Sequence, residues 1–129
     1  MMPKEIITAY LEALGKGDIG VAFSYFSTDA QWHQPGSHQF AGLKTGTEEI
    51  GKMVAGMMDA TQGTFALKPI GNLMVNGNMA ALPVNFTGTI EDRTMDMTGV
   101  DLFEVKDGKI INVWLFSDDQ ELENTFWGK

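Results

Sequence analysis

The stretch TMDMTGVDLFEVK (Thr94–Lys106), followed by KIINVWLFS (Lys109–Ser117), decides the fold of this chain. Side chains two residues apart in a strand point the same way, so one face of the first stretch is predicted to be apolar. Asp107-Gly108 between the stretches is typical of a tight hairpin turn. On the apolar face stands Asp101. A carboxylate there must find partners, become neutral or face a cavity, because burying its charge is costly.

The rest of the chain predicts helices first and strands afterwards. Apolar residues at helical spacing follow Pro3 and include Tyr10, and Asp18 and Thr47 are plausible caps of a second and a third helix. The segment Asp29–Pro35 is predicted to be a short strand, and a glycine-rich loop follows it. From residue 64 onward the pattern is of strands, with hairpin signals at Asn76-Gly77 and Asp92-Arg93. We therefore expect one α+β domain over residues 1–129, with helices packed on a curved antiparallel or mixed sheet.

Composition limits the possible partners and compartments. The chain has 129 residues and a net charge of −8, with 17 acidic and 9 basic residues, which argues against nucleic acid or an anionic membrane as a partner. It has 0 cysteines, so disulfides and thiolate chemistry are excluded. No stretch approaches the roughly 18 apolar residues of a spanning helix, and no signal-peptide core is evident. A cytoplasmic protein that binds no membrane is the expectation.

Four segments in order resemble the nuclear-transport-factor-2-like (NTF2-like) superfamily, and most closely its SnoaL-like (polyketide cyclase) and ketosteroid-isomerase branches. They are AYLEALGKGD (residues 9–18), DAQWHQPG (29–36), FAG with GTEEI (40–42 and 46–50) and GVDLFEVKDGKIINVW (99–114). The resemblance implies a cone-shaped fold that encloses an apolar pocket. It also implies a homodimer formed through the outer face of the sheet.

The same resemblance assigns catalytic roles to Tyr10 and Asp101. Ketosteroid isomerases bind the developing oxyanion with two groups, a tyrosine and a protonated aspartic acid. The tyrosine corresponds to Tyr10. The aspartic acid lies in an Ile-Asp-x-Phe motif, which corresponds to Val100–Phe103 here. The aspartate that acts as general base is replaced at both family positions. In the isomerases this aspartate comes directly before a proline, and here Gln34 precedes Pro35. In the cyclases it follows a tryptophan, and here Leu115 follows Trp114.

Two histidines are further candidates. His33 lies in the segment where the isomerases keep their base, and an imidazole is suited to moving protons near neutral pH. Strand parity, however, puts Trp32 and Gln34 on one face and His33 on the other, so the proton acceptor is either His33, reached through a bend at Pro35, or a water held by Gln34. His38 is expected to be exposed at the pocket mouth. Two histidines without an acidic cluster do not predict a metal site, and no cofactor is expected.

The pocket is expected to be lined by apolar and flexible side chains. The chain has 9 methionines, whose thioethers adapt to varied apolar ligands. The acidic tail from Asp118 to Glu123 is expected to be solvated, with Phe126 and Trp127 docked on the domain. The predicted substrate-binding residues are Trp32, Gln34, Met53, Met57, Phe86, Met97, Phe103 and Leu115.

Two functions follow from this pattern. In the first, Tyr10 and neutral Asp101 hold the oxygen of a small apolar carbonyl compound, steroid-like or polyketide-like, during isomerisation or cyclisation by proton transfer; in a variant, ionised Asp101 is itself the base. In the second, a dimeric cone binds an apolar small molecule and catalyses nothing. The missing bases leave open whether the protein is an enzyme, and a scaffold for a partner is a third reading.

Overall fold

The computed structural model describes residues 2–129. Four helices are present in this part of the chain: α1 (Pro3–Gly15), α2 (Ile19–Ser24), α3 (Gly46–Ala60) and α4 (Gln120–Trp127). The Asp18 carboxylate accepts a hydrogen bond from the Val21 N–H and so caps α2, as predicted. Helix α3 begins at Gly46, one residue before the predicted cap Thr47.

Seven strands form one sheet. They are β1 (Phe26–Gln34), β2 (Gly42–Thr45), β3 (Ala66–Pro69), β4 (Met74–Asn76), β5 (Met79–Ile90), β6 (Arg93–Lys106) and β7 (Lys109–Ser117). Their order is β2-β1-β7-β6-β5-β3, with β4 also paired to β5. All neighbours are antiparallel except β1 and β7, which run parallel, so the sheet is mixed.

The hairpin turns follow the sequence signals closely. The β6–β7 turn is Asp107-Gly108, and both residues have positive φ, which suits a two-residue hairpin. The other two turns lie one residue away from the predicted pairs: Gly77-Asn78 joins β4 to β5, and Glu91-Asp92 joins β5 to β6. The signals therefore located each hairpin correctly, and strand pairing set the final register.

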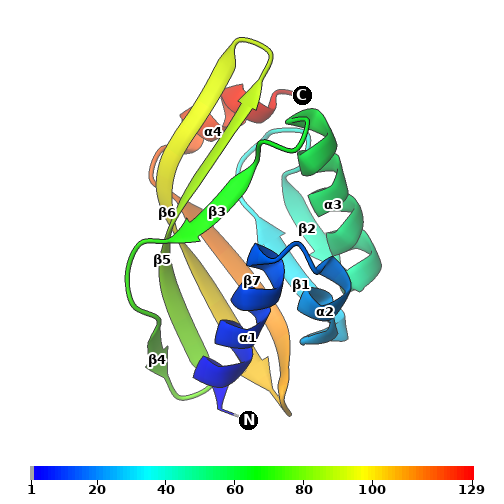
Figure 1. Ribbon diagram of the computed structural model, residues 1–129, viewed down its shortest axis with the longest axis vertical. Helices are drawn as coiled ribbons and strands as arrows, with labels where there is room; N and C mark the ends of the chain where they lie inside the picture. The colour runs from blue at the N-terminus through cyan, green and yellow to red at the C-terminus, as the bar shows by residue number, and fades with distance from the viewer. Residues whose placement is uncertain (1) are drawn as a thin grey trace.

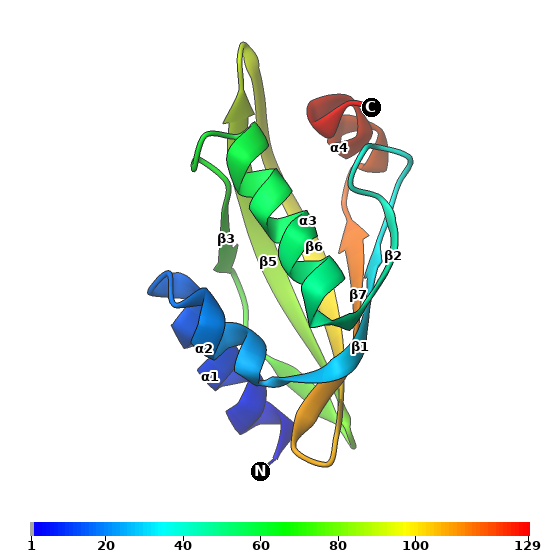
Figure 2. The ribbon, with the colours of Figure 1, turned by 90° about the vertical axis from the view of Figure 1, so that its right-hand side faces the viewer.

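The sheet curves, and the helices α1, α2 and α3 lie on one side of it (Figures 1 and 2). The covered, inner face carries the buried residues of each long strand, such as Ala30, Trp32, Leu82, Val84 and Phe103. The opposite, outer face has no helix packed on it in these views. This is the α+β cone expected from the sequence, in which the interior lies between α1, α3 and the inner face.

Three details differ from the sequence-based prediction. Strand β1 begins at Phe26 rather than Asp29, and β2 forms within the predicted loop by pairing with β1. The third difference is Glu123, which was expected to be solvated but has an exposed fraction of 3%. The tail folds into α4, which follows the end of β7 (Figure 2), and Glu123, Phe126 and Trp127 on this helix are buried.

Candidate functional site

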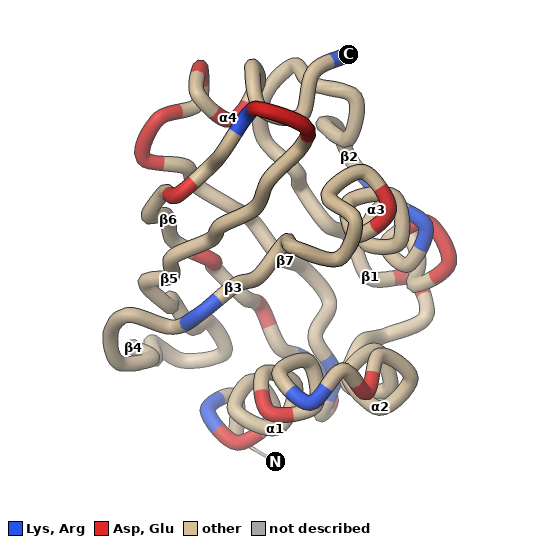
Figure 3. Tube along the Cα trace, turned by 45° about the horizontal axis from the view of Figure 1, so that its top comes forward, with Lys and Arg blue, Asp and Glu red and all other residues tan. Residues whose placement is uncertain are grey.

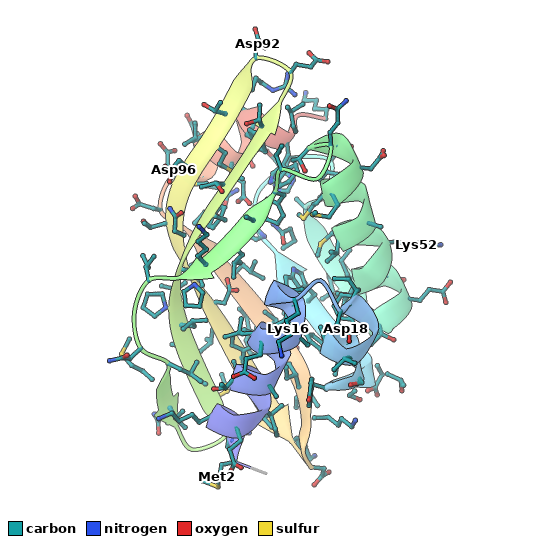
Figure 4. All side chains as sticks on the ribbon, viewed as in Figure 1. Met2, Lys16, Asp18, Lys52, Asp92 and Asp96 are labelled. Atoms are coloured by element: carbon teal, nitrogen blue, oxygen red, sulfur yellow. The ribbon has the colours of Figure 1, made fainter. Side chains whose placement is uncertain are left out.

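Asp101 lies at the centre of the inner face. It pairs with Leu82 of β5 and Leu115 of β7, so it has a strand on both sides. Its exposed fraction is 5%. By contrast, Lys16, Lys52, Asp92 and Asp96 all project outward from the molecule (Figure 4). The prediction that strand parity buries Asp101 is confirmed.

Tyr10 approaches the same part of the inner face from α1. The centre of its ring lies 5.2 Å from that of Phe26 and 6.0 Å from that of Phe103, both in edge-to-face geometry. Phe103 stands two residues after Asp101 on the same face of β6. Helix α1 therefore places the phenol, whose exposed fraction is 4%, over the strand that carries the buried carboxyl.

Burial changes the acidity of both groups. Removal from water raises the pKa of Asp101 from its usual 3.8 to about 7, because the charged form loses its solvation. The pKa of Tyr10 is also raised above its ordinary value, first by burial and then by the Asp101 carboxylate nearby. Tyr10 and Asp101 therefore face the same apolar interior, one from α1 and the other from β6, and no direct hydrogen bond joins them among the described residues. Near neutral pH, Tyr10 is a hydrogen-bond donor, and Asp101 is protonated in a large part of the molecules.

The predicted substrate-binding residues belong to the same interior as this pair. Phe26 stacks against Trp32 with ring centres 6.4 Å apart, and thereby continues the aromatic wall from Tyr10 to β1. Leu115 packs against the core from β7. The others all belong to the buried interior: Trp32, Gln34, Met53, Met57, Phe86, Met97 and Phe103.

The structure's two described hollows lie elsewhere. One, of about 460 Å³, opens beside the start of α3 and includes Glu48 and Lys52. The other, of about 220 Å³, lies over β6 and β7 and includes Val100 and Phe116. Neither is lined by Tyr10 or Asp101. Phe26 and Phe103 pack against Tyr10, and both Tyr10 and Asp101 are buried, so a ligand would enter by displacing side chains of the core.

His33 lies on the outer face. Its ring stacks on Trp114, with centres 5.0 Å apart, and its Nε2 lies 2.9 Å from Asn112 Oδ1. Strand parity continues through Gln34, and the alternative in which His33 reaches the interior is therefore wrong. Gln34 instead faces inward beside Trp32, as the alternation predicted.

Gln34 belongs to a polar chain that the sequence analysis missed. Trp32 donates a hydrogen bond from Nε1 to Gln34 Oε1 (2.9 Å), and Gln34 Nε2 donates to Glu123 Oε2 (3.3 Å). Ser117 Oγ and Gln120 Nε2 donate to Glu123 Oε1 at 2.7 and 3.0 Å. No local pattern indicates this contact, because it forms only when α4 folds back over the sheet.

His38 is also buried, contrary to the expectation of exposure. Its side chain has an exposed fraction of 0%, and its Nε2 lies 4.0 Å from Glu123 Oε2. Nδ1 accepts the Phe40 N–H (3.1 Å), so Nε2 carries the hydrogen of the neutral ring, and it has no hydrogen-bond partner among the described residues. Burial lowers the pKa of His38, whereas Glu123 acts in the opposite direction.

Three features of the described residues concern metal ligands, apolar helices and the distribution of charge. Residues 2–129 contain no group of three or more His, Cys, Asp or Glu side chains that could hold a metal ion. Over the same range, no helix is both long enough and apolar enough to cross a bilayer. Acidic segments are spread over the molecule, and basic ones are scattered rather than gathered on one face (Figure 3).

Comparison with known families and structures agrees with this architecture. The model of the SnoaL-like domain matches residues 7–113. No curated protein matches the chain.

Solved structures match over nearly the whole chain. A protein of unknown function with a cystatin-like fold from Xanthomonas campestris is 40% identical, with 100% of both chains covered and a TM-score of 0.94. Bal32a, from a soil-derived mobile gene cassette, is 23% identical, covers 97% of this chain with 95% of its own, and has a TM-score of 0.91. TerC, co-crystallised with polyporic acid, is 21% identical over 90% of this chain and 92% of its own, with a TM-score of 0.78.

Proposed function

Since this chain belongs to the SnoaL-like domain family of the NTF2-like superfamily, we propose that it binds a small apolar carbonyl compound and catalyses proton transfer next to the carbonyl group. The reaction class would be isomerisation or cyclisation of a steroid-like or polyketide-like ring. One observation carries the proposal: a phenol on α1 and a carboxyl on the inner face of β6 are both buried in one apolar interior, and the phenol packs on Phe103, two residues from the carboxyl.

The chemistry follows from the protonation states of these two groups. Neutral Asp101 and Tyr10 each have an O–H to donate, and a carbonyl oxygen can accept both hydrogen bonds. When a neighbouring C–H loses its proton, negative charge moves onto that oxygen and both bonds strengthen. Each such fixed donor contributes on the order of 3 kcal/mol to lowering the barrier in a dry site.

The packing of the interior suits an apolar ligand that must make room for itself. Met53, Met57 and Met97 line the interior, and their unbranched side chains can change rotamer at low cost. TerC, which has a similar fold, was crystallised with a small molecule, polyporic acid. That likeness supports only the capacity of the fold to hold such a compound.

The proposal is tested by binding of 2-naphthol, whose oxygen stands in for an enolate, followed through tryptophan fluorescence at pH 6. We expect saturable binding to the wild type. Tyr10→Phe and Asp101→Leu should each weaken it about tenfold or more, because each removes one hydrogen bond to the ligand oxygen. Tyr25→Phe and Asp96→Asn are the matched controls, since Tyr25 is half-buried in α2's cap and Asp96 is exposed on β6. Equal affinity in all five proteins would refute the site.

A second function, binding without turnover, is favoured by Gln34 and Leu115, which carry no ionisable group at the positions of the family bases. Deuterium exchange at the carbons beside the carbonyl of 2-tetralone, followed by NMR in D₂O, separates the two functions. An enzyme accelerates the exchange, and Tyr10→Phe slows it. A pure binder takes up 2-naphthol but leaves the exchange at its rate in buffer.

A further inference from the structure

We infer that Glu123, on the C-terminal helix α4, is the proton acceptor of this site. The inference rests on the proposed function, since it supplies the base that neither Gln34 nor Leu115 can provide. It follows from the position of Glu123 relative to Asp101 and from the hydrogen bonds that hold it.

The strand register brings Glu123 to the inner face near Asp101. Asp101 pairs with Leu115 across β6 and β7. In the parallel pairing of β1 with β7, His33 is the partner of Trp114, so the next residue of β1, Gln34, lies beside Leu115. Asp101, Leu115 and Gln34 therefore form one row across the sheet, about 10 Å from end to end at two strand spacings. Glu123 is bound by Gln34, at the end of this row, and by Ser117, two residues beyond Leu115.

This arrangement places the two carboxyl groups on either side of the same packed apolar side chains, which a ligand would have to displace. Trp32, Leu115 and Met97 lie between or beside them: Trp32 is bonded to Gln34, and the Met97 sulfur accepts the Asp119 N–H at the start of α4 (3.4 Å). A ring compound whose carbonyl oxygen lies at Asp101 and Tyr10 would extend over Leu115 toward Glu123. Its C–H bonds next to the carbonyl then face the second carboxylate.

The two oxygens of Glu123 have different surroundings. Oε1 accepts two hydrogen bonds, from Ser117 and Gln120, at 2.7 and 3.0 Å. Oε2 accepts only the longer bond from Gln34, at 3.3 Å, and lies 4.0 Å from His38 Nε2. Oε1 therefore anchors the group, and Oε2 keeps a lone pair that can accept a proton.

The proton transfer balances without a further reagent. Oε2 of Glu123 takes a proton from the carbon next to the carbonyl group. The electron pair of the broken C–H bond forms the C=C bond of the enolate. The π electron pair of the carbonyl group moves onto its oxygen, which Tyr10 and Asp101 hold by hydrogen bonds. Glu123 then returns the same proton to another carbon of the conjugated system, or exchanges it with solvent. Gln34 is a positioning residue, because it orients Oε2 and does not itself exchange the proton.

A purely structural role of Glu123 predicts different behaviour. If the carboxylate only tied α4 to β1 and β7, Glu123→Gln would change stability and leave the chemistry of bound ligands intact. Glutamine keeps an acceptor for Ser117 and Gln120 but cannot accept a proton near neutral pH. The matched control is Glu121→Gln, an exposed residue two positions earlier on the same helix.

The test measures deuterium exchange of 2-tetralone by NMR and binding of 2-naphthol by fluorescence, in the same preparations. Glu123→Gln is expected to slow the protein-catalysed exchange at least 100-fold, with naphthol affinity within threefold of the wild type and Glu121→Gln unchanged. Glu123→Asp, which keeps the carboxylate on a shorter side chain, should recover part of the rate. If Glu123→Gln does not fold, Glu123→Asp alone decides: a rate lowered about tenfold with naphthol binding intact supports the inference.

The contrary results are distinct. If Glu123→Gln exchanges deuterium at the wild-type rate, the role of Glu123 is overturned and the proposed function stands. If only Glu123→Asp folds, a wild-type exchange rate in that variant has the same meaning. Naphthol binding without accelerated exchange in the wild type would also overturn it, and would identify a binding protein. If the wild type neither binds 2-naphthol nor accelerates exchange, the proposed function itself fails, and the inference fails with it.

Discussion

Burial of Asp101 serves the proposed chemistry but lowers the stability of the fold when the carboxyl group ionises. Its burial raises its pKa to about 7, which keeps it available as a donor but makes the folded state less tolerant of its ionisation. Because the folded pKa lies above that of the unfolded chain, the folded state holds the proton more tightly. The free energy of unfolding must then fall as pH rises from about 4 to about 7, and this group has no further effect above that range.

The first prediction concerns this pH dependence. A shift from 3.8 to about 7 corresponds to about 4 kcal/mol at 1.36 kcal/mol per pH unit. Asp101→Asn, which cannot ionise, should therefore gain stability relative to the wild type by a few kcal/mol between pH 4 and pH 8. Urea unfolding at both pH values measures the difference, with Asp96→Asn as the control that shows no such gain. A pH-independent difference for Asp101→Asn would mean that the carboxyl is solvated in the folded protein.

The two carboxyl groups of the site differ in how far the sequence could identify them. Asp101 interrupts an alternating strand pattern, so its burial follows from neighbours two residues away on the same strand. Glu123 is one of several acidic residues in a polar tail, and nothing next to it indicates a buried partner. Its contacts with Gln34 join residues 89 positions apart, a separation that only the folded chain bridges.

Among the elements, α4 has the largest effect on the site, because it carries Glu123 and closes one end of the interior. The loop after β1 holds it in place. The Ser37 N–H donates to Asn124 Oδ1 (3.0 Å), the Gln39 N–H donates to the Gly128 carbonyl (2.8 Å), and Gln39 Nε2 donates to the Trp127 carbonyl (2.8 Å). Gly36 permits this close approach: its φ is +99°, and a Cβ there would collide with Asn124 Oδ1 and Gln120 Nε2.

The second prediction follows from that contact. Gly36→Ala should destabilise the protein by about 2–3 kcal/mol. About 1–2 kcal/mol is the cost of a side chain at positive φ, and about 1 kcal/mol more is expected because the ends of the Asn124 and Gln120 side chains must move and weaken the hydrogen bond from the Ser37 N–H to Asn124. Gly63→Ala is the matched control: its φ is +81°, and it has no heavy atom within 4 Å of the added Cβ. It should lose only about 1–2 kcal/mol.

Thermal and urea unfolding measure both variants. In the range where Gly36→Ala stays folded, 2-tetralone exchange should fall more than 2-naphthol affinity, since α4 carries Glu123 and not the oxygen-binding pair. Equal destabilisation by the two substitutions would show that α4 does not pack tightly on Gly36.

For the molecule as a whole, the outer face of the sheet is the surface that fits the expected homodimer. Trp114 and Leu102 pair across β7 and β6 on this face, His33 stacks on Trp114, and Phe116 has an exposed fraction of 56%. Such a patch on a sheet without a covering helix is typical of an interface.

The third prediction is that Phe116→Glu converts a dimer into a monomer. A charge at the centre of an apolar contact loses solvation without gaining a partner, and in the dimer two such charges would approach one another. Sedimentation velocity or light scattering determines the mass. The control is Met58→Glu, at a position with an exposed fraction of 37% on α3, the helix on the other side of the sheet. A wild-type monomer, or a dimer in both variants, would exclude this interface.

The amino-acid pattern alone predicted the strand alternation, the three hairpins, the helices after Pro3 and Asp18, and the inward direction of Tyr10 and Asp101. It left open whether Gln34 or His33 faces the interior. These features depend on neighbours a few residues away, through side-chain periodicity, turn geometry and helix capping. The pairing of β2, the burial of His38 and the docking of Glu123 on Gln34 and Ser117 became visible only in the folded chain. The contacts of His38 and Glu123 join segments distant in the sequence and depend on the docking of α4 against the loop after β1, whereas β2 pairs with β1 across the short loop between them.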